Sequence, residues 1–211
     1  GNNMKYQDFK NKFKNTPFFR SANLAQLPGS LQMLRNQLHK WKTQELVFQL
    51  KKGLYTLNSN DRHTKLDALV LSNTLVSPSY ISLEYALSLY GLIPEKIKTI
   101  TAVSTKKTQQ YSNVIGHFTY QHLKQSAFTG YIQKQTDSYF YFMATKEKAL
   151  LDFFYLNINQ ITDFEAYRFQ NLETIDLKIL KNYLAVYNNK KLDTTILNFI
   201  KYIKQQEYQS L

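Results

Sequence analysis

The spacing of the apolar residues changes abruptly between positions 31 and 57, and this change constrains the fold more than any other feature. Four of these residues recur every three or four positions, the period of one helix face: Leu31, Leu34, Leu38 and Trp41. From Glu45 to Leu50 apolar Leu46, Phe48 and Leu50 alternate with polar partners, and after Lys51-Lys52-Gly53 the segment Leu54–Leu57 returns. Alternation around a glycine-containing turn is typical of a β-hairpin. We therefore expect a helix over residues 31–43, followed by a hairpin with a basic turn.

Two more helices are expected before residue 31. The aromatic residues of the segment 4–15 have helical spacing, which ends before Pro17 because the residue preceding a proline avoids the helical conformation. Ser21 is the expected cap of a short helix over residues 22–27, and a Pro-Gly turn follows that helix. Short helices joined in this way are a candidate helix-turn-helix. Because a hairpin comes after them, we expect a winged helix-turn-helix domain over residues 4–58.

The positive charge of the chain is concentrated in the same segment. The whole chain has a formal net charge of +12, and residues 1–65 hold twelve lysines and arginines against Asp8, Glu45 and Asp61, a net +9. A basic block on one folded unit attracts a polyanion such as nucleic acid. A general bias towards basic residues would also explain the charge, and the placement of the motifs has to decide between the two explanations.

The polar face of the predicted helix over residues 31–43 suits DNA recognition. In a helix-turn-helix the second helix enters the major groove, where Asn and Gln pair with adenine and Arg pairs with guanine. Lysines of the helix and of the hairpin turn can neutralise phosphates. The residues expected to bind DNA are Arg20, Gln32, Arg35, Asn36, His39, Lys40, Lys42, Thr43, Lys51 and Lys52. The alternative is that this helix face is simply solvated, but that alternative does not account for the basic turn beside it.

The remainder of the chain predicts a second domain of mixed composition. Asn58 to Asp61 is a polar segment that we interpret as a linker, so the second domain is expected over residues 62–211. Strands are expected near residues 100–104, 115–121, 130–133 and 138–144, and helices near 65–75, 83–90, 146–155, 177–187 and 192–206. The run Tyr139–Phe142 is aromatic at every position, which predicts a strand buried on both faces. The expected fold class is α+β: an N-terminal winged helix-turn-helix followed by a mixed α/β C-terminal domain with a helical tail.

Other functional classes fit the sequence less well. The chain has no cysteine, which excludes disulfides and zinc-thiolate sites. A nucleotidyltransferase needs paired acidic residues after a Gly-Ser turn, and no such pair follows Gly29-Ser30. His117 and His122 are too poorly spaced on a strand to share a metal ion. We therefore expect no enzyme activity, no catalytic or metal-binding residues and no cofactor. RNA binding through Tyr139 and Tyr141 is a further alternative, although a core role fits these residues better.

Three segments resemble those of a known family. The stretch Ser77–Pro94, SPSYISLEYALSLYGLIP, resembles a long motif of the AbiEi-family antitoxins of type IV toxin-antitoxin systems. Ile100–Thr108, ITAVSTKKT, and Ala144–Asp152, ATKEKALLD, look like two shorter motifs of that family in the same order. Lys146 departs from the pattern, because many relatives carry proline there. With the winged helix, the resemblance covers residues 5–160 and leaves the last 50 residues unaligned.

The resemblance implies a cytoplasmic antitoxin with two roles. Its winged helix would bind double-stranded DNA at inverted repeats in its own promoter and repress its operon. Its C-terminal domain would counter an AbiEii-like nucleotidyltransferase toxin, without a stable complex being required. No apolar run reaches the roughly 20 residues that a membrane span needs, so no membrane partner is expected. An orphan winged-helix regulator without a toxin partner is the alternative, and the neighbouring reading frame distinguishes the two.

Overall fold

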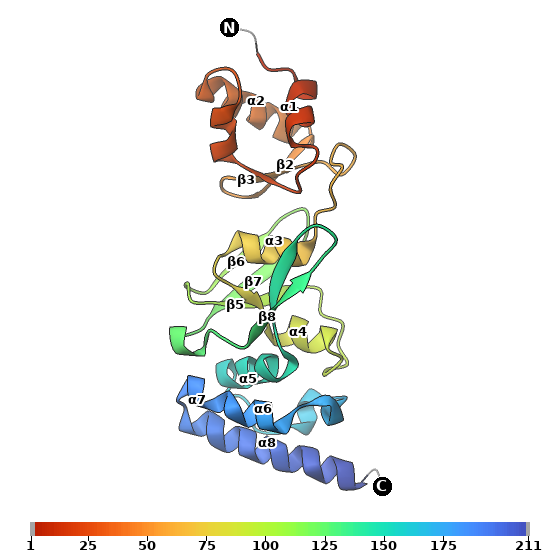
Figure 1. Cartoon of the computed structure of the whole chain (residues 1–211), viewed down its shortest axis with the longest axis vertical. Coiled ribbons are helices and arrows are strands. Elements are labelled where there is room, and N and C mark those ends of the chain that lie inside the picture. Colours follow the sequence, from red (N-terminus) through yellow and green to blue (C-terminus); the bar gives the residue numbers. More distant parts are fainter. Residues whose placement is uncertain (1–2, 210–211) are drawn as a thin grey trace. The chain divides into compact units, whose positions relative to one another are not determined.

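The computed structural model describes residues 3–209, which form a mixed α+β protein, as expected. The chain divides into two compact units (Figure 1). The first unit contains the residues up to Leu71 together with Tyr111–Gly116, and the second contains Ser72–Gln110 and the residues from His117 onward. The segment Tyr111–Gly116 therefore belongs to the first unit, although its first two residues are the end of strand β6 (Gln109–Ser112).

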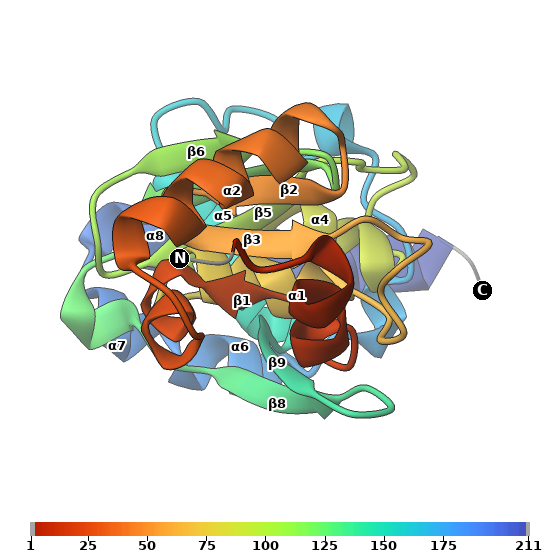
Figure 2. The same cartoon turned by 90° about the horizontal axis from the view of Figure 1, so that it is seen from above.

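The first unit combines helices with a small antiparallel sheet. Its elements are α1 (Tyr6–Phe13), β1 (Phe19–Arg20), the 3-10 helix η1 (Ser21–Gln26), α2 (Leu31–Thr43), β2 (Val47–Lys51) and β3 (Leu54–Leu57). The strand order is β1-β3-β2. Helices α1 and α2 lie on one face of this sheet (Figures 1 and 2). The short helix begins one residue earlier than predicted and is 3-10 rather than α-helical, so Ser21 is its first residue and not its cap.

The core of the first unit contains most of the predicted apolar stripe. Leu34, Leu38 and Trp41 of α2 are buried, with Trp41 only 5% exposed. The Trp41 ring lies 4.6 Å from the ring of Phe9 on α1, measured between centroids. Leu31, in contrast, is 45% exposed, so its predicted burial is wrong. Leu31 is the first residue of α2, nearly one turn before Leu34, the first buried residue of the stripe.

Local sequence signals set the ends of α2 and of the hairpin. The side chain of Ser30 caps α2 by accepting a hydrogen bond from the Met33 amide at 3.3 Å. After the helix, Glu45 adopts a positive φ of 57°, which turns the chain into β2. Lys51 pairs with Leu54 across the hairpin, so the turn consists of Lys52 and Gly53, the latter with φ 81°. Glycine adopts this conformation without strain, which explains its place in the basic turn.

The segment interpreted as a linker lies inside the first unit. The Asn58 side chain donates to the Leu46 carbonyl oxygen at 3.2 Å and to the Asp61 carboxylate at 2.7 Å. Asp61 also forms a 2.8 Å ion pair with Lys10 of α1. The first unit extends a further ten residues to Leu71. The polar residues 58–61 thus form an ordered turn against the hairpin rather than the boundary between the two units.

The second unit is built on a mixed six-stranded sheet with the order β6-β7-β5-β4-β9-β8. The strands are β4 (Tyr80–Ile81), β5 (Ile100–Ser104), β6 (Gln109–Ser112), β7 (His117–His122), β8 (Tyr131–Gln135) and β9 (Phe140–Ala144). Its helical elements are α3 (Ala68–Leu75), which begins in the first unit, α4 (Leu83–Leu89), η2 (Gln125–Ala127), α5 (Lys146–Leu156), η3 (Glu165–Tyr167), η4 (Leu172–Thr174), α6 (Leu177–Asn182), α7 (Leu184–Tyr187) and α8 (Lys190–Gln209). Pairing is parallel for β4–β9 and β5–β7 and antiparallel for β4–β5 and β8–β9.

Helices of the C-terminal tail cover α5, which is buried along most of its length. In Figure 1 α5 lies next to the sheet, and α6, α7 and α8 follow beyond it. The aromatic strand β9 is less enclosed than predicted. Phe140 is 50% exposed, and Tyr141 and Phe142 are only partly buried. The prediction of burial on both faces is wrong because this end of the sheet is not enclosed: the neighbouring strand β8 is also mostly exposed.

Candidate nucleic-acid interface

Helix α2 presents a continuous polar face to solvent. Six of the ten predicted DNA-binding residues lie on it, and all six are exposed: Gln32, Arg35, Asn36, His39, Lys40 and Thr43. The Gln32 amide donates to Asn36 Oδ1 at 3.1 Å, which orients both side chains along the face. The Thr43 hydroxyl donates to the His39 carbonyl oxygen at 3.1 Å. The amide group of Asn36 and the guanidinium of Arg35 are the kinds of group that read base edges in the major groove.

Three further basic residues gather at one end of the small sheet. Arg20 on β1 and Lys51 on β2 both pair with Leu54, which lies between them on β3. Lys52 follows in the exposed turn of the hairpin. The amide of Ser21 donates to the Gly53 carbonyl oxygen at 3.0 Å and fixes β1 beside that turn. The sheet therefore brings together cations that are 31 residues apart in the sequence, as a phosphate-binding surface requires.

Two of the predicted site residues are engaged within the first unit. Lys42 donates to Gln49 Oε1 at 2.8 Å and lies 6.0 Å from the centroid of the Tyr55 ring. Its ammonium group is thus directed towards the sheet and away from the exposed face of α2. The ammonium of Lys51 lies 5.9 Å from the centroid of the Tyr111 ring. This is a cation–π contact with the segment 111–116.

Negative charge is almost absent from this part of the surface. Between Asp8 and Asp61 the only acidic residue in the sequence is Glu45, at the end of α2. The negative charge of the Asp61 carboxylate is paired with the ammonium of Lys10. Hydrogen bonding to Lys10 also lowers the pKa of Asp61. Tyr6 donates to the same carboxylate at 2.8 Å, and its pKa is raised by burial and by Asp61. The exposed charge beside α2 is therefore predominantly positive, which favours an anionic ligand.

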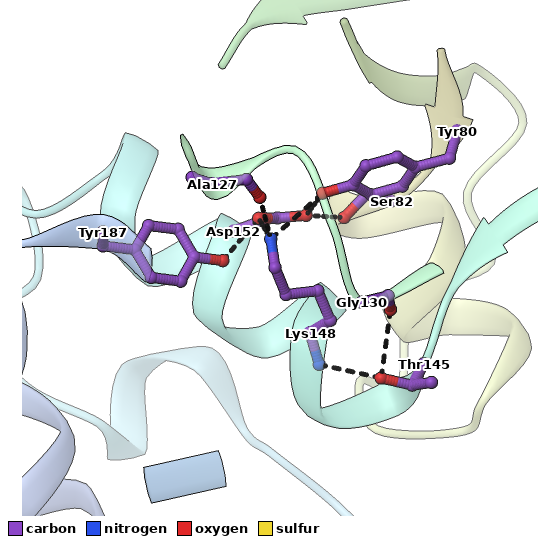
Figure 3. Close-up of polar contacts among 8 residues, drawn as sticks. All are labelled: Tyr80, Ser82, Ala127, Gly130, Thr145, Lys148, Asp152 and Tyr187. Carbon is purple, nitrogen blue, oxygen red and sulfur yellow. Dashed lines mark hydrogen bonds and ion pairs between the residues drawn. The ribbon is translucent and has the colours of Figure 1, made fainter. Parts of the chain in front are cut away.

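A second polar cluster lies in the core of the second unit, centred on the carboxylate of Asp152 (Figure 3). Lys148 forms an ion pair with Asp152 at 2.6 Å, and both side chains are 0% exposed. The carboxylate also accepts hydrogen bonds from the hydroxyl groups of Tyr80 and Ser82, each at 2.8 Å, and of Tyr187 at 2.5 Å. We call these five residues the Asp152 network. It connects α5 to β4, to the start of α4 and to α7.

The Asp152 network draws its residues from two of the segments that carry the family resemblance. Tyr80 and Ser82 belong to the first motif, and Lys148 and Asp152 belong to the third. Ser82 precedes the first residue of α4, but its side chain makes no capping bond and donates to Asp152 instead. Thr145 caps α5 as its position predicts, accepting from the Lys148 amide at 3.3 Å.

Burial sets the protonation of the network. It raises the pKa of Tyr80 and Tyr187 well above the usual value, and the negative charge of Asp152 raises both further. Both phenols therefore remain hydrogen-bond donors at neutral pH. Burial lowers the pKa of Lys148, and the neighbouring Asp152 opposes that shift. Its charged groups are inaccessible to solvent, and the network connects α5 to β4 and α7 within the core.

No protein-family model matches this chain, and no curated protein matches its sequence. Within residues 3–209, no group of three or more His, Cys, Asp or Glu side chains is placed to hold a metal ion. In the same part of the chain, no helix is both long enough and apolar enough to cross a membrane.

Proposed function

We propose that the first unit is a winged helix-turn-helix that binds double-stranded DNA. The observation that carries this proposal is the exposed polar face of α2, which lacks acidic residues and lies in the same unit as a basic hairpin turn. The order of elements supports it, because three helices are followed by a two-stranded hairpin and β1 completes the sheet. In this proposal η1 and α2 are the helix-turn-helix pair, and the β2–β3 hairpin is the wing.

Each group of residues then has a distinct role. Helix α2 enters the major groove, which is wide enough for one α-helix. Arg35 and Asn36 contact base edges and give sequence preference, whereas Lys40, Lys52 and Arg20 contact phosphates and give affinity. Lys42 is not among the contacts, because it is bound to Gln49 within the unit.

We further propose that the chain is an antitoxin of the AbiEi type that represses its own operon in the cytoplasm. Binding at inverted repeats in its own promoter would be its regulatory role, and the second unit would counter an AbiEii-like nucleotidyltransferase toxin. Support comes from the three sequence segments, two of which meet in the Asp152 network. Those segments therefore form one scaffold, which favours a common fold over a chance match of short motifs. An orphan regulator without a toxin remains the second candidate.

Sequence-specific binding is tested with electrophoretic shifts on the chain's own upstream DNA and on an unrelated duplex of equal length. Asn36→Ala should weaken binding to the upstream DNA by about 1–3 kcal/mol, because a bidentate base contact is lost. The unrelated duplex should bind Asn36→Ala and the wild type equally. Gln7→Ala on α1 is the matched control, since Gln7 is also an exposed amide in the first unit. Equal loss on both duplexes, or no loss on either, would contradict base reading by α2.

The antitoxin role is tested separately, by co-expression with the protein of the adjacent reading frame. The proposal predicts that this neighbour is nucleotidyltransferase-like and toxic alone, and that the full chain relieves the toxicity. A neighbour without toxicity, together with normal DNA binding, would support the orphan regulator.

A further inference from the structure

The second unit contains a pocket of about 130 Å³ that the proposed DNA binding does not use. Its walls are the rings of Phe128, Tyr131 and Phe142, and its remaining lining comes from Asn73 and the segment 77–79. Aromatic walls with a few polar groups are typical of a site for a small planar ligand. The volume is below that of pockets that enclose whole drug-sized ligands, so it suits one ring system whose substituents project outward.

The aromatic walls are held in place by the surrounding core. The Tyr131 ring stacks on the buried ring of Tyr80, with centroids 4.8 Å apart and an interplanar angle of 23°. Tyr80 is fixed in turn by its hydrogen bond to Asp152. Phe142 meets Tyr131 edge to face at 5.5 Å. Tyr131 is nevertheless 38% exposed, so part of this aromatic surface remains open to a ligand.

Asn73 supplies a hydrogen-bond donor beside these rings. Its Oδ1 accepts from the Phe142 backbone amide at 2.6 Å, and this bond determines which way the side-chain amide points. Its Nδ2 is buried, and among residues 3–209 it has no hydrogen-bond acceptor. A buried donor without an acceptor destabilises the folded state, and a ligand that offers an acceptor atom recovers that loss.

Basic residues follow strand β5, whose last residue is bonded to Pro78 of the pocket lining. The Ser104 hydroxyl donates to the Pro78 carbonyl oxygen at 2.5 Å and accepts from the Lys106 amide at 3.1 Å. Lys106 and Lys107 are both exposed. The segment that lines the pocket is thus bonded to the start of a cationic stretch, which suits a ligand that joins a planar ring to a phosphate.

We propose that this pocket binds a nucleobase. The base stacks on Tyr131 with its edge towards Phe142, and an acceptor atom of its ring receives a hydrogen bond from Asn73 Nδ2. The base has to be unpaired and unstacked. Inside a duplex its faces are covered by the neighbouring bases and its edge by its partner. The site is therefore distinct from the duplex-binding surface of the first unit. A free nucleotide and an unpaired base in a strand offer the same chemistry at the pocket.

The test uses the full-length chain labelled with ¹⁵N and follows the side-chain amide resonances of Asn73. The probes are adenosine 5′-monophosphate, uridine 5′-monophosphate, single-stranded pentanucleotides of each base, and ribose 5-phosphate as the probe without a base. At least one nucleotide should shift the Asn73 resonances in a saturable manner, and ribose 5-phosphate should not. A pentanucleotide that binds at least about tenfold more tightly than the mononucleotide identifies a strand as the source, because further bases then stack or contact the protein. Equal affinities identify the free nucleotide.

Three variants locate the binding. Asn73→Asp keeps an acceptor for the Phe142 amide but removes the donor, and Tyr131→Leu removes the stacking surface. In Asn73→Asp, binding is followed at the backbone amide of Phe142, which is bonded to this side chain. Each should weaken nucleotide binding about tenfold or more. Tyr141→Leu is the matched control, because Tyr141 precedes Phe142 on β9 and points to the opposite face of the strand. It should leave affinity unchanged.

Three results would overturn the proposal. One is the absence of any shift at Asn73 with every nucleobase probe, which would assign its donor to water or to a protein partner. Another is an equal response to ribose 5-phosphate. The third is an equal loss of affinity in Tyr131→Leu and Tyr141→Leu.

Discussion

Replacing Lys148 with methionine tests whether the Asp152 network holds the second unit together. The substitution keeps an unbranched side chain, one atom shorter, but leaves the Asp152 carboxylate without its cation, which lies 2.6 Å away. It also removes the 2.8 Å hydrogen bond from Lys148 to the Ala127 carbonyl oxygen. Removing one partner of a buried ion pair typically costs about 3–5 kcal/mol. The three hydroxyl donors to Asp152 remain, so we expect a loss within this range rather than above it.

Urea unfolding followed by circular dichroism measures this loss, and the single tryptophan assigns it to a unit. Trp41 lies in the first unit, so its fluorescence should report an unchanged unfolding transition. The dichroism of the whole chain should show the second unit unfolding at lower urea. Lys181→Met on α6 is the matched control, because Lys181 is exposed and its replacement should change stability by less than about 0.5 kcal/mol.

A double variant separates the charge from the packing. Adding Asp152→Asn to Lys148→Met removes the unpaired negative charge while an amide oxygen still accepts hydrogen bonds. The double variant should therefore be more stable than Lys148→Met alone. A cost below about 1 kcal/mol for Lys148→Met, similar to that of Lys181→Met, would show that the buried ion pair does not stabilise the second unit.

Two further predictions concern other residues of the core. Trp41 should emit at short wavelength and resist iodide quenching, and Trp41→Ala should cost about 3–5 kcal/mol, as large-to-small core changes do; a readily quenched tryptophan would mean that α2 is rotated from its described register. Burial raises the pKa of Tyr90 to about 12, above the value of 10.0 that applies when it is unfolded. Between these values the native state holds a proton that the unfolded state has released, so stability falls as pH rises from 10 towards 12. Tyr90→Phe should make this fall shallower in urea unfolding measured at a series of pH values, and an unchanged fall would show that Tyr90 does not contribute.

The first unit could be predicted from sequence because its signals are local. The helical stripe of α2, the alternation of the hairpin and the glycine of its turn each depend on residues within one element. Leu34, Leu38 and Trp41 are buried as their spacing predicts. Leu31 fits the same spacing but is exposed, since periodicity shows which side of a helix is apolar and not where the core ends along its axis.

The Asp152 network could not be predicted, because its partners come together only in the folded chain. Lys148 and Asp152 are four residues apart on a helix, a spacing that also describes an ordinary exposed ion pair. Tyr187 is 35 residues beyond Asp152. The one signal in the sequence is the apolar run on either side of Asp152, which leaves α5 with little surface for solvent.

Three other features had ambiguous signals or none. The polar residues 58–61 match both a linker and an ordered turn, and their hydrogen bonds to the hairpin decide in favour of the turn. The aromatic run of β9 predicts burial. The neighbouring strand β8, at the end of the sheet, is mostly exposed, and Phe140 is half exposed as well. Strand β4 has two residues, too few for a pattern of alternation to be recognised.

The salt dependence of DNA affinity tests whether the first unit binds DNA through the cations of α2 and the hairpin turn. Affinity for the chain's upstream DNA, measured by fluorescence anisotropy of labelled duplex, should fall linearly on a log-log plot with a slope of about −0.9 per phosphate neutralised. The double variant Lys40→Ala, Lys52→Ala should make that slope shallower by up to about 1.8, because it removes two cations from α2 and the hairpin turn. The double variant Lys178→Ala, Lys181→Ala removes the same charge from exposed positions on α6 and should leave the slope unchanged. An affinity independent of salt, or an equal change of slope in both double variants, would contradict DNA binding by the first unit.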